Sequence, residues 1–210
     1  MQLLSTAYFP PIQYYSKLVQ ENPIYIECFE NYAKQSYRNR CDILGANGRL
    51  TLSVPVLKGA RKKILTKDIQ IEYVENWQKI HFKGIESAYR KSPYYEYYID
   101  DIEPIFNKDF KYLIDLNEHI MSILNEIIEI NPQIERTTDY IKDTSGYIDW
   151  REGIHPKKSK RLEDENYTEV AYTQVFSDKF EYQENLSILD LIFNLGPESL
   201  IHLNKTIKTK

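Results

Sequence analysis

Residues 2–29 read QLLSTAYFPPIQYYSKLVQENPIYIECF, and they predict a strand, a helix and a second strand in close succession. The apolar start at 2–8 is typical of a short buried strand, which the prolines at 10–11 end because proline fixes φ. Apolar residues then recur at helical spacing over 12–19, and a second strand-like segment follows at 24–29. This order is the opening of an α/β sheet.

The chain continues with a predicted β-hairpin and a long helical region. Residues 41–44 and 49–56 flank Asn47-Gly48, a pair that tolerates positive φ in a tight turn. Leucines and valines alternate with other residues along the second arm, so one of its faces is expected to be buried. Apolar residues at helical spacing then predict helices over 75–91 and 106–128.

The second half of the chain has a weaker pattern. Residues 133–167 are polar and predict loops, whereas the apolar run 185–195 predicts a deeply buried helix with Asn185 as its N-cap. Residues 1–204 are expected to form a single domain, followed by a frayed tail at 205–210. The predicted fold is α/β: a three-layer Rossmann-like domain with a mainly parallel sheet, an attached β-hairpin and a long central helical region.

Composition narrows the class of protein. The 210 residues carry a net charge of −4 without a long run of one sign, which argues against a general nucleic-acid binder. Cys28 and Cys41 are too few for a disulfide framework and form no zinc motif, so a reduced, cytoplasmic setting is expected. The first residues lack the basic and apolar regions of a signal peptide, and we expect no membrane span.

Two histidines are candidate catalytic residues. The chain has no P-loop, GxGxxG, GxSxG or HExxH motif, so the candidates come from single residues and their neighbours. His81 lies on an apolar helix stripe, and His155 lies in a loop rich in charged residues. A neutral imidazole at either place would act as a general base near pH 7. The alternative for His81 is a half-buried histidine hydrogen-bonded within the core.

Several polar and aromatic residues are candidate ligand contacts. Guanidinium forks and an amide suit a phosphate, a carboxylate or a sugar diphosphate, and solvated loops are the alternative. The candidate ligand-binding residues are Tyr8, Asn39, Arg40, Tyr89, Arg151 and Lys157. Asp190 lies in the most apolar helix and needs a partner, for which we expect Arg40 or Arg151.

Ordered segments along most of the chain resemble one known family. They are Tyr8-Phe9-Pro10 with Tyr14-Tyr15, Asn39-Arg40 with Ile43, residues 52–56, Trp77 with His81, residues 88–89 with 92–95, residues 115–117 and residues 186–196. Their order and spacing resemble the WbqC-like family. The resemblance implies a bacterial cytoplasmic protein encoded among O-antigen or other surface-polysaccharide functions, and described as a candidate aminoacyl, glycine or acyl transferase.

The chain departs from the family pattern in two places. The family opens with a His-Gln-Pro stretch, and here Leu4, Ser5 and Thr6 take those places. A Gly-Ala-rich strand and a Ser-Gly loop of the family are replaced by residues 147–160. These departures suggest a divergent branch whose chemistry has moved onto residues such as Arg151, or has been lost.

The leading hypothesis is a transferase that modifies a nucleotide-linked or lipid-linked sugar. In it, Arg40 and Arg151 hold a phosphate, and His81 or His155 deprotonates an amine or hydroxyl. The expected partner is therefore an anionic small molecule such as a nucleotide-linked sugar. The sequence indicates no particular cofactor and leaves a homo-oligomer open. The alternatives are a non-catalytic scaffold subunit of a polysaccharide-synthesis complex and an adenylyl-transferring nucleotide-binding domain.

Overall fold

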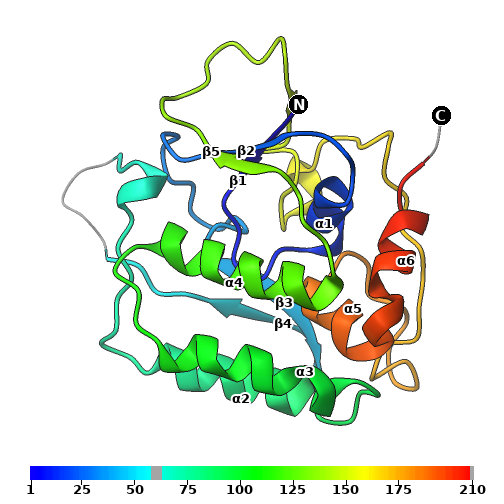
Figure 1. The fold of residues 1–210 in the computed structure, drawn as a ribbon. Helices are drawn as coiled ribbons and strands as arrows, with labels where there is room; N and C mark the ends of the chain where they lie inside the picture. The colour runs from blue at the N-terminus through cyan, green and yellow to red at the C-terminus, as the bar shows by residue number, and fades with distance from the viewer. Residues whose placement is uncertain (58–62, 209–210) are drawn as a thin grey trace.

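A computed structural model describes residues 1–57 and 63–208 and shows an α/β fold with one parallel sheet (Figure 1). The sheet has the order β5-β2-β1-β6, and each neighbouring pair is parallel. Its strands are β1 (Gln2–Ser5), β2 (Ile24–Glu27), β5 (Ile134–Arg136) and β6 (Ile148–Asp149). The predicted α/β class, the mainly parallel sheet and the attached hairpin are confirmed.

The N-terminal strands pair as the sequence predicts. Helix α1 (Ile12–Leu18) carries the chain back from β1 to β2, which a parallel pair requires. Every residue of β1 and of α1 is buried, so this unit lies in the middle of the molecule. The turn after β1 holds Phe9 in the left-handed region, with φ 39°, a conformation that costs free energy outside glycine.

The hairpin consists of β3 (Arg40–Gly45) and β4 (Gly48–Ser53), with Ala46-Asn47 as its two-residue loop. Positive φ falls on Gly48 alone of the Asn47-Gly48 pair, at 101°. The predicted burial of alternate residues is correct for Leu52 and wrong for Leu50, which is 40% exposed.

Three helices form the central helical region. Helix α2 (Trp77–Tyr89) buries the predicted stripe and packs against β3, and α3 (Tyr95–Ile102) follows it. The single helix predicted over 106–128 is wrong, because a 3-10 turn at Glu103–Asn107 precedes an extended break. Only α4 (Leu113–Ile128) is a continuous helix, and it crosses the view between the sheet and the hairpin in Figure 1.

The last helices are α5 (Ile188–Leu195) and α6 (Ser199–Lys205). The N-cap of α5 is Ser187 rather than Asn185, because the Ser187 hydroxyl accepts from the Leu189 N–H. Within the predicted tail, Thr206 is buried and Ile207 forms a β-bridge with Tyr167. No helix in the described ranges is long and apolar enough to cross a membrane.

Candidate functional site

The order of the strands changes direction at β1: β2 and β5 lie on one side of β1, and β6 lies on the other. The chain leaves β1 through α1 to reach β2 on one side, continues to β5, and returns to pair β6 with the other side of β1. Ligands of open α/β sheets bind at the carboxyl ends of the strands at such a point. The structure has a cavity of about 10 Å³ there, which is room for about one water molecule.

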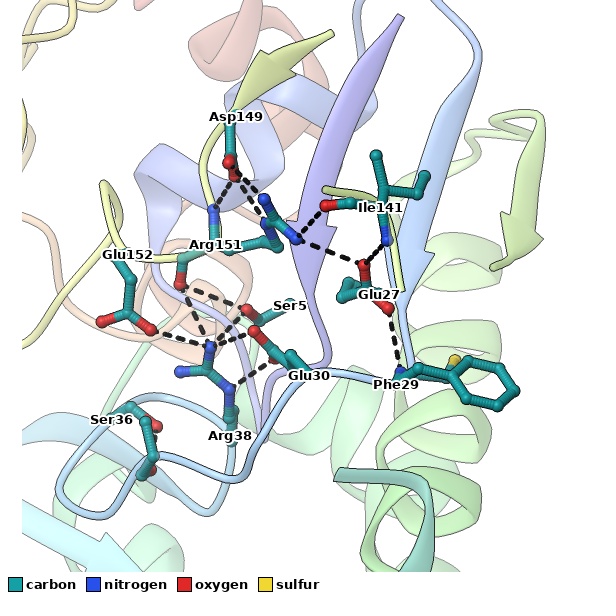
Figure 2. Close-up of polar contacts among 12 residues, drawn as sticks. Ser5, Glu27, Phe29, Glu30, Ser36, Arg38, Ile141, Asp149, Arg151 and Glu152 are labelled. Atoms are coloured by element: carbon teal, nitrogen blue, oxygen red, sulfur yellow. Dashed lines mark hydrogen bonds and ion pairs between the residues drawn. The ribbon is translucent and has the colours of Figure 1, made fainter. Parts of the chain in front are cut away.

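We call this cavity the switch-point crevice. It is lined by Ser5, Thr6, Ala7, Tyr14, Tyr37, Arg38, Trp150, Arg151 and Ile154. Residues that directly follow β1 and β6 therefore meet in it, together with the segment that precedes β3. The residues around it form a network of charged side chains, which Figure 2 shows.

Arg38 is the centre of this network and is 2% exposed. Its Nε donates to Glu30 Oε1 at 2.7 Å and its Nη2 to Glu30 Oε2 at 2.7 Å, which makes a bidentate pair. The same Nη2 lies 2.7 Å from Ser5 Oγ, 3.3 Å from the Arg151 carbonyl and 3.1 Å from Glu152 Oε1. The Glu152 side chain is 63% exposed, so it closes the network on the solvent side.

The Nη2 atom of Arg38 has more hydrogen-bond acceptors around it than protons to donate. Nη2 carries two protons and faces four acceptor oxygens, whereas Nη1 has no hydrogen-bond partner among the described residues. Ser5 Oγ uses its own proton on the Arg151 carbonyl. These four oxygens therefore compete for two protons, and a hydroxyl or ammonium group of a ligand would supply further donors.

Arg151 clamps the two strands that flank β1. Its Nη1 donates to Glu27 Oε2 at 3.2 Å, and its Nε and Nη2 donate to the two oxygens of Asp149 at 2.9 and 2.6 Å. Each guanidinium nitrogen thus already donates to the protein, and Nη1 also donates to the Ile141 carbonyl. Four of the five N–H groups of Arg151 thus donate to the protein, and one N–H of Nη2 is left for the predicted phosphate contact.

The network as a whole carries excess negative charge. The carboxylates Glu27, Glu30, Asp149 and Glu152 face two guanidinium groups, which leaves a net charge of −2. Burial raises the pKa of the Glu30 carboxyl, and the bonds from Arg38 oppose that rise. A site with this balance favours a ligand that brings protons or positive charge.

Two further predicted contacts line a different cavity. Asn39 and Arg40 lie at a groove of about 530 Å³, whereas the two residues before them, Tyr37 and Arg38, line the switch-point crevice. The Asn39 amide donates to the Val54 carbonyl at 2.8 Å. The structure therefore separates Arg40 from Arg151 instead of joining them around one ligand.

His81 and Tyr8 form a buried pair. The Tyr8 hydroxyl lies 2.8 Å from His81 Nδ1, and Trp77 packs against both rings. Burial lowers the pKa of His81 to about 4, so the ring is neutral at physiological pH. Neither side chain lines the crevice or the groove, and a catalytic role for His81 remains a prediction.

His155 and Lys157 lie on the loop beside the switch-point crevice. His155 is 3% exposed, and its Nδ1 accepts the Lys157 backbone N–H at 3.0 Å. That bond places the imidazole proton on Nε2, so this nitrogen is a donor and not a base in the observed arrangement. Burial lowers the pKa of His155, and the Lys157 side chain is exposed.

Tyr89 lies in the core and lines neither the switch-point crevice nor the groove. It is fully buried against Phe193. Near it, Asp190 accepts from the Tyr172 hydroxyl at 2.6 Å and from Gln174 Nε2 at 3.0 Å. The expected arginine partner of Asp190 is wrong, because Arg40 has no ion pair in the described chain and Arg151 pairs with other carboxylates. Two neutral donors bind one oxygen of the carboxylate instead.

Sequence reasoning missed most of the network. Ser5, Glu27, Glu30 and Arg38 are not among the residues that the sequence predicts for the site. A usable signal was present, because Ser5 ends β1 and Glu27 ends β2, at the carboxyl edge where a parallel sheet binds ligands. Over the described ranges, His, Cys, Asp and Glu form no cluster suited to a metal ion.

Comparison with known proteins gives one match. The model of the WbqC-like protein family matches residues 6–202, a range that includes the crevice loops, the groove and helix α5. No curated protein and no solved structure matches the chain. Because the match covers nearly the whole sequence, the chain belongs to the WbqC-like protein family.

Proposed function

We propose that this WbqC-like protein is a cytoplasmic transferase of bacterial surface-polysaccharide biosynthesis. In this proposal it moves an acyl or aminoacyl group onto an amine or hydroxyl of a sugar precursor, and the acceptor group enters the switch-point crevice. The observation that carries the proposal is the excess of acceptor oxygens around Arg38 at the point where the sheet connections reverse.

The chemistry of the crevice fits such an acceptor. A sugar amine or hydroxyl is a proton donor, and it would meet Ser5 Oγ and the exposed carboxylate of Glu152. Arg38 is fixed by its bidentate pair with Glu30, so the donors and acceptors around it are preorganised. The crevice has room for about one water molecule in this structure, so in this proposal the loop that carries Glu152 moves to admit the acceptor group.

The transfer itself exchanges one bond for another. The acceptor nitrogen or oxygen attacks the acyl carbon, a C–N or C–O bond forms, and the bond from the acyl carbon to its carrier breaks. The proton of the acceptor ends on the carrier. In this proposal Glu152, whose exposed carboxylate contacts Arg38, passes that proton on.

The positions of the tyrosines argue against the alternative that the protein is a non-catalytic scaffold subunit. A scaffold that binds through tyrosines needs them exposed and adjacent. Many of the 18 tyrosines are instead in the core, among them Tyr8, Tyr14, Tyr15, Tyr37, Tyr89 and Tyr95. The exposed ones, such as Tyr97 and Tyr140, come from segments far apart in the chain.

A mass-spectrometric transfer assay tests the proposal. Purified protein is incubated with acyl-coenzyme A donors and with nucleotide sugars that carry a free amine or only hydroxyl groups, and a product heavier by the acyl group is expected. Glu152→Gln should slow its formation by about 10²-fold, the usual effect of losing a general base. The matched control is Glu163→Gln, at an exposed position beyond the crevice. Absence of any acylated product, or equal rates for both variants, would refute the proposal.

A further inference from the structure

We infer that the groove beside Asn39 and Arg40 is a second binding site, specific for a sugar that carries a single acidic group. This groove, which we call the Arg40 groove, has a volume of about 530 Å³, within the range of about 300–1,000 Å³ that small-molecule sites occupy. It lies between residues 32–40, the end of β4 and residues 72–75. This site goes beyond the proposed transfer reaction.

Arg40 is distinguished by its lack of a charged partner. Arg38, Arg49, Arg90, Arg136, Arg151 and Arg161 each lie within 4.0 Å of a carboxylate. Arg40 has no such ion pair in the part of the chain that the structure describes, and the Arg40 Nε is buried without a hydrogen-bond partner. An unpaired guanidinium in the wall of a groove is the donor set that binds a carboxylate or a phosphate oxygen.

Asn39 adds an unused acceptor next to this donor. Its Nδ2 is held by the Val54 carbonyl at 2.8 Å, which fixes the amide, while its Oδ1 is buried without a partner. Unsatisfied buried polar atoms are rare in native proteins because each costs free energy. The Asn39 Oδ1 and the Arg40 Nε are both buried, so a ligand in the groove reaches them only when the two side chains turn outward; a hydroxyl and an anionic oxygen would then satisfy Asn39 and Arg40 together.

The rest of the wall selects a sugar with one negative charge. Lys34 and Arg40 are balanced by Glu72 and Glu75, so a ligand with several charges would meet carboxylates as well as cations. The carboxylates accept hydrogen bonds from hydroxyl groups. Tyr32 and the apolar residues at the end of β4 offer a surface for the C–H face of a sugar ring.

The Arg40 groove and the switch-point crevice are separate sites. Tyr37 and Arg38 line the crevice, and the next two residues line the groove. None of the hydrogen bonds of the Arg38 network involves Arg40, so a substitution at Arg40 removes none of them. Failure of acyl transfer would not affect this inference, because its test measures binding only.

Titration of the ¹⁵N-labelled protein with glucuronate, glucose 1-phosphate and glucose tests the site. Glucuronate, the monoanion, is expected to bind best and glucose least, with shifts in the amides of the groove. Arg40→Gln should weaken glucuronate binding at least tenfold, because a charge-assisted bond is lost. Arg90→Gln, at an exposed arginine of the α2 surface, is the matched control and should bind as the wild type does.

Several outcomes would overturn the inference. They are equal affinity for glucose and glucuronate, unchanged affinity in Arg40→Gln, or no saturable binding of either acidic sugar to the wild type. If Arg40→Gln does not fold, Lys34→Gln at the exposed end of the groove serves instead. It should weaken glucuronate binding by a smaller factor, and an unchanged affinity there would count against the site.

Discussion

Replacing Asp190 by Asn should stabilise this protein at neutral pH and not in acid. Asp190 is fully buried, and burial raises its pKa from the usual 3.8 to about 6. In the unfolded chain the carboxyl ionises near 3.8, so the folded state carries a cost that grows from pH 4 to pH 7. The gap between the two values corresponds to about 3 kcal/mol, since one pKa unit is worth about 1.4 kcal/mol.

The amide fits the hydrogen-bond environment of Asp190. Tyr172 and Gln174 both donate to Oδ2, and an amide oxygen accepts from them equally. Oδ1 and the nearby Tyr89 hydroxyl are both buried without a hydrogen-bond partner, so an amide nitrogen in place of Oδ1 can donate to that hydroxyl oxygen. We therefore expect Asp190→Asn to raise the free energy of unfolding by about 2–3 kcal/mol at pH 7 and by less than about 1 kcal/mol at pH 4.

Urea unfolding of wild type and variant from pH 4 to pH 8 measures this difference directly. Asp178→Asn, at an exposed aspartate, is the control and should leave the free energy of unfolding within about 0.5 kcal/mol of the wild type at every pH. The reasoning is refuted if Asp190→Asn is destabilising at pH 7, or if its effect is the same at pH 4 as at pH 7.

Three further predictions concern stability. Gly196→Ala should lower the free energy of unfolding more than Gly48→Ala does. Both glycines have positive φ, but only a Cβ at position 196 would clash, at 2.5 Å from the Tyr94 ring. Chemical unfolding of the two variants measures the difference. Lys17→Ala should cost about 3–5 kcal/mol by leaving Asp164 buried and unpaired, and Lys17→Met with Asp164→Leu should recover most of it in the same assay. Burial lowers the pKa of His81 from 6.5 to about 4, so its stabilising contribution is present above pH 6.5 and lost as pH falls towards 4; His81→Gln should flatten that part of the pH profile by about 3 kcal/mol.

The elements with strong local patterns were predictable from the sequence. The first strand, α1 and β2 follow from apolar spacing and proline positions, and the buried stripe of α2 follows from its helical period. The predicted helix over 106–128 failed because an extended break at residues 108–112 interrupts an apolar spacing that continues across it.

Strands β5 and β6 could not be predicted from local pattern. They are three and two residues long, and they lie in a polar region that predicts loops. Their place in the sheet depends on pairing with β2 and β1, so it comes from tertiary contacts and not from periodicity. The switch point exists because β6 pairs with β1, so it could not be predicted from the sequence either.

The candidate site was predicted in part. Arg40 and Asn39 line a groove, their ligand role remains a prediction, and Arg151 lines the crevice with four of its five N–H groups bonded to the protein. The pairing of Arg38 with Glu30 joins residues eight positions apart through a turn, and no short motif marks it. The site forms where single residues from separate loops meet in space, and a sequence pattern does not show which loops meet.

The most direct test of the switch-point crevice is calorimetric binding of a nucleotide sugar with a free amine and of its N-acetylated counterpart. The two ligands differ in the proton-donating group that the acceptor-rich network around Arg38 should recognise. Wild-type protein should bind the amine form about tenfold or more tightly, and Glu152→Gln should lose most of that preference. Equal binding of the two ligands by the wild type, or an undiminished preference in Glu152→Gln, would contradict this account.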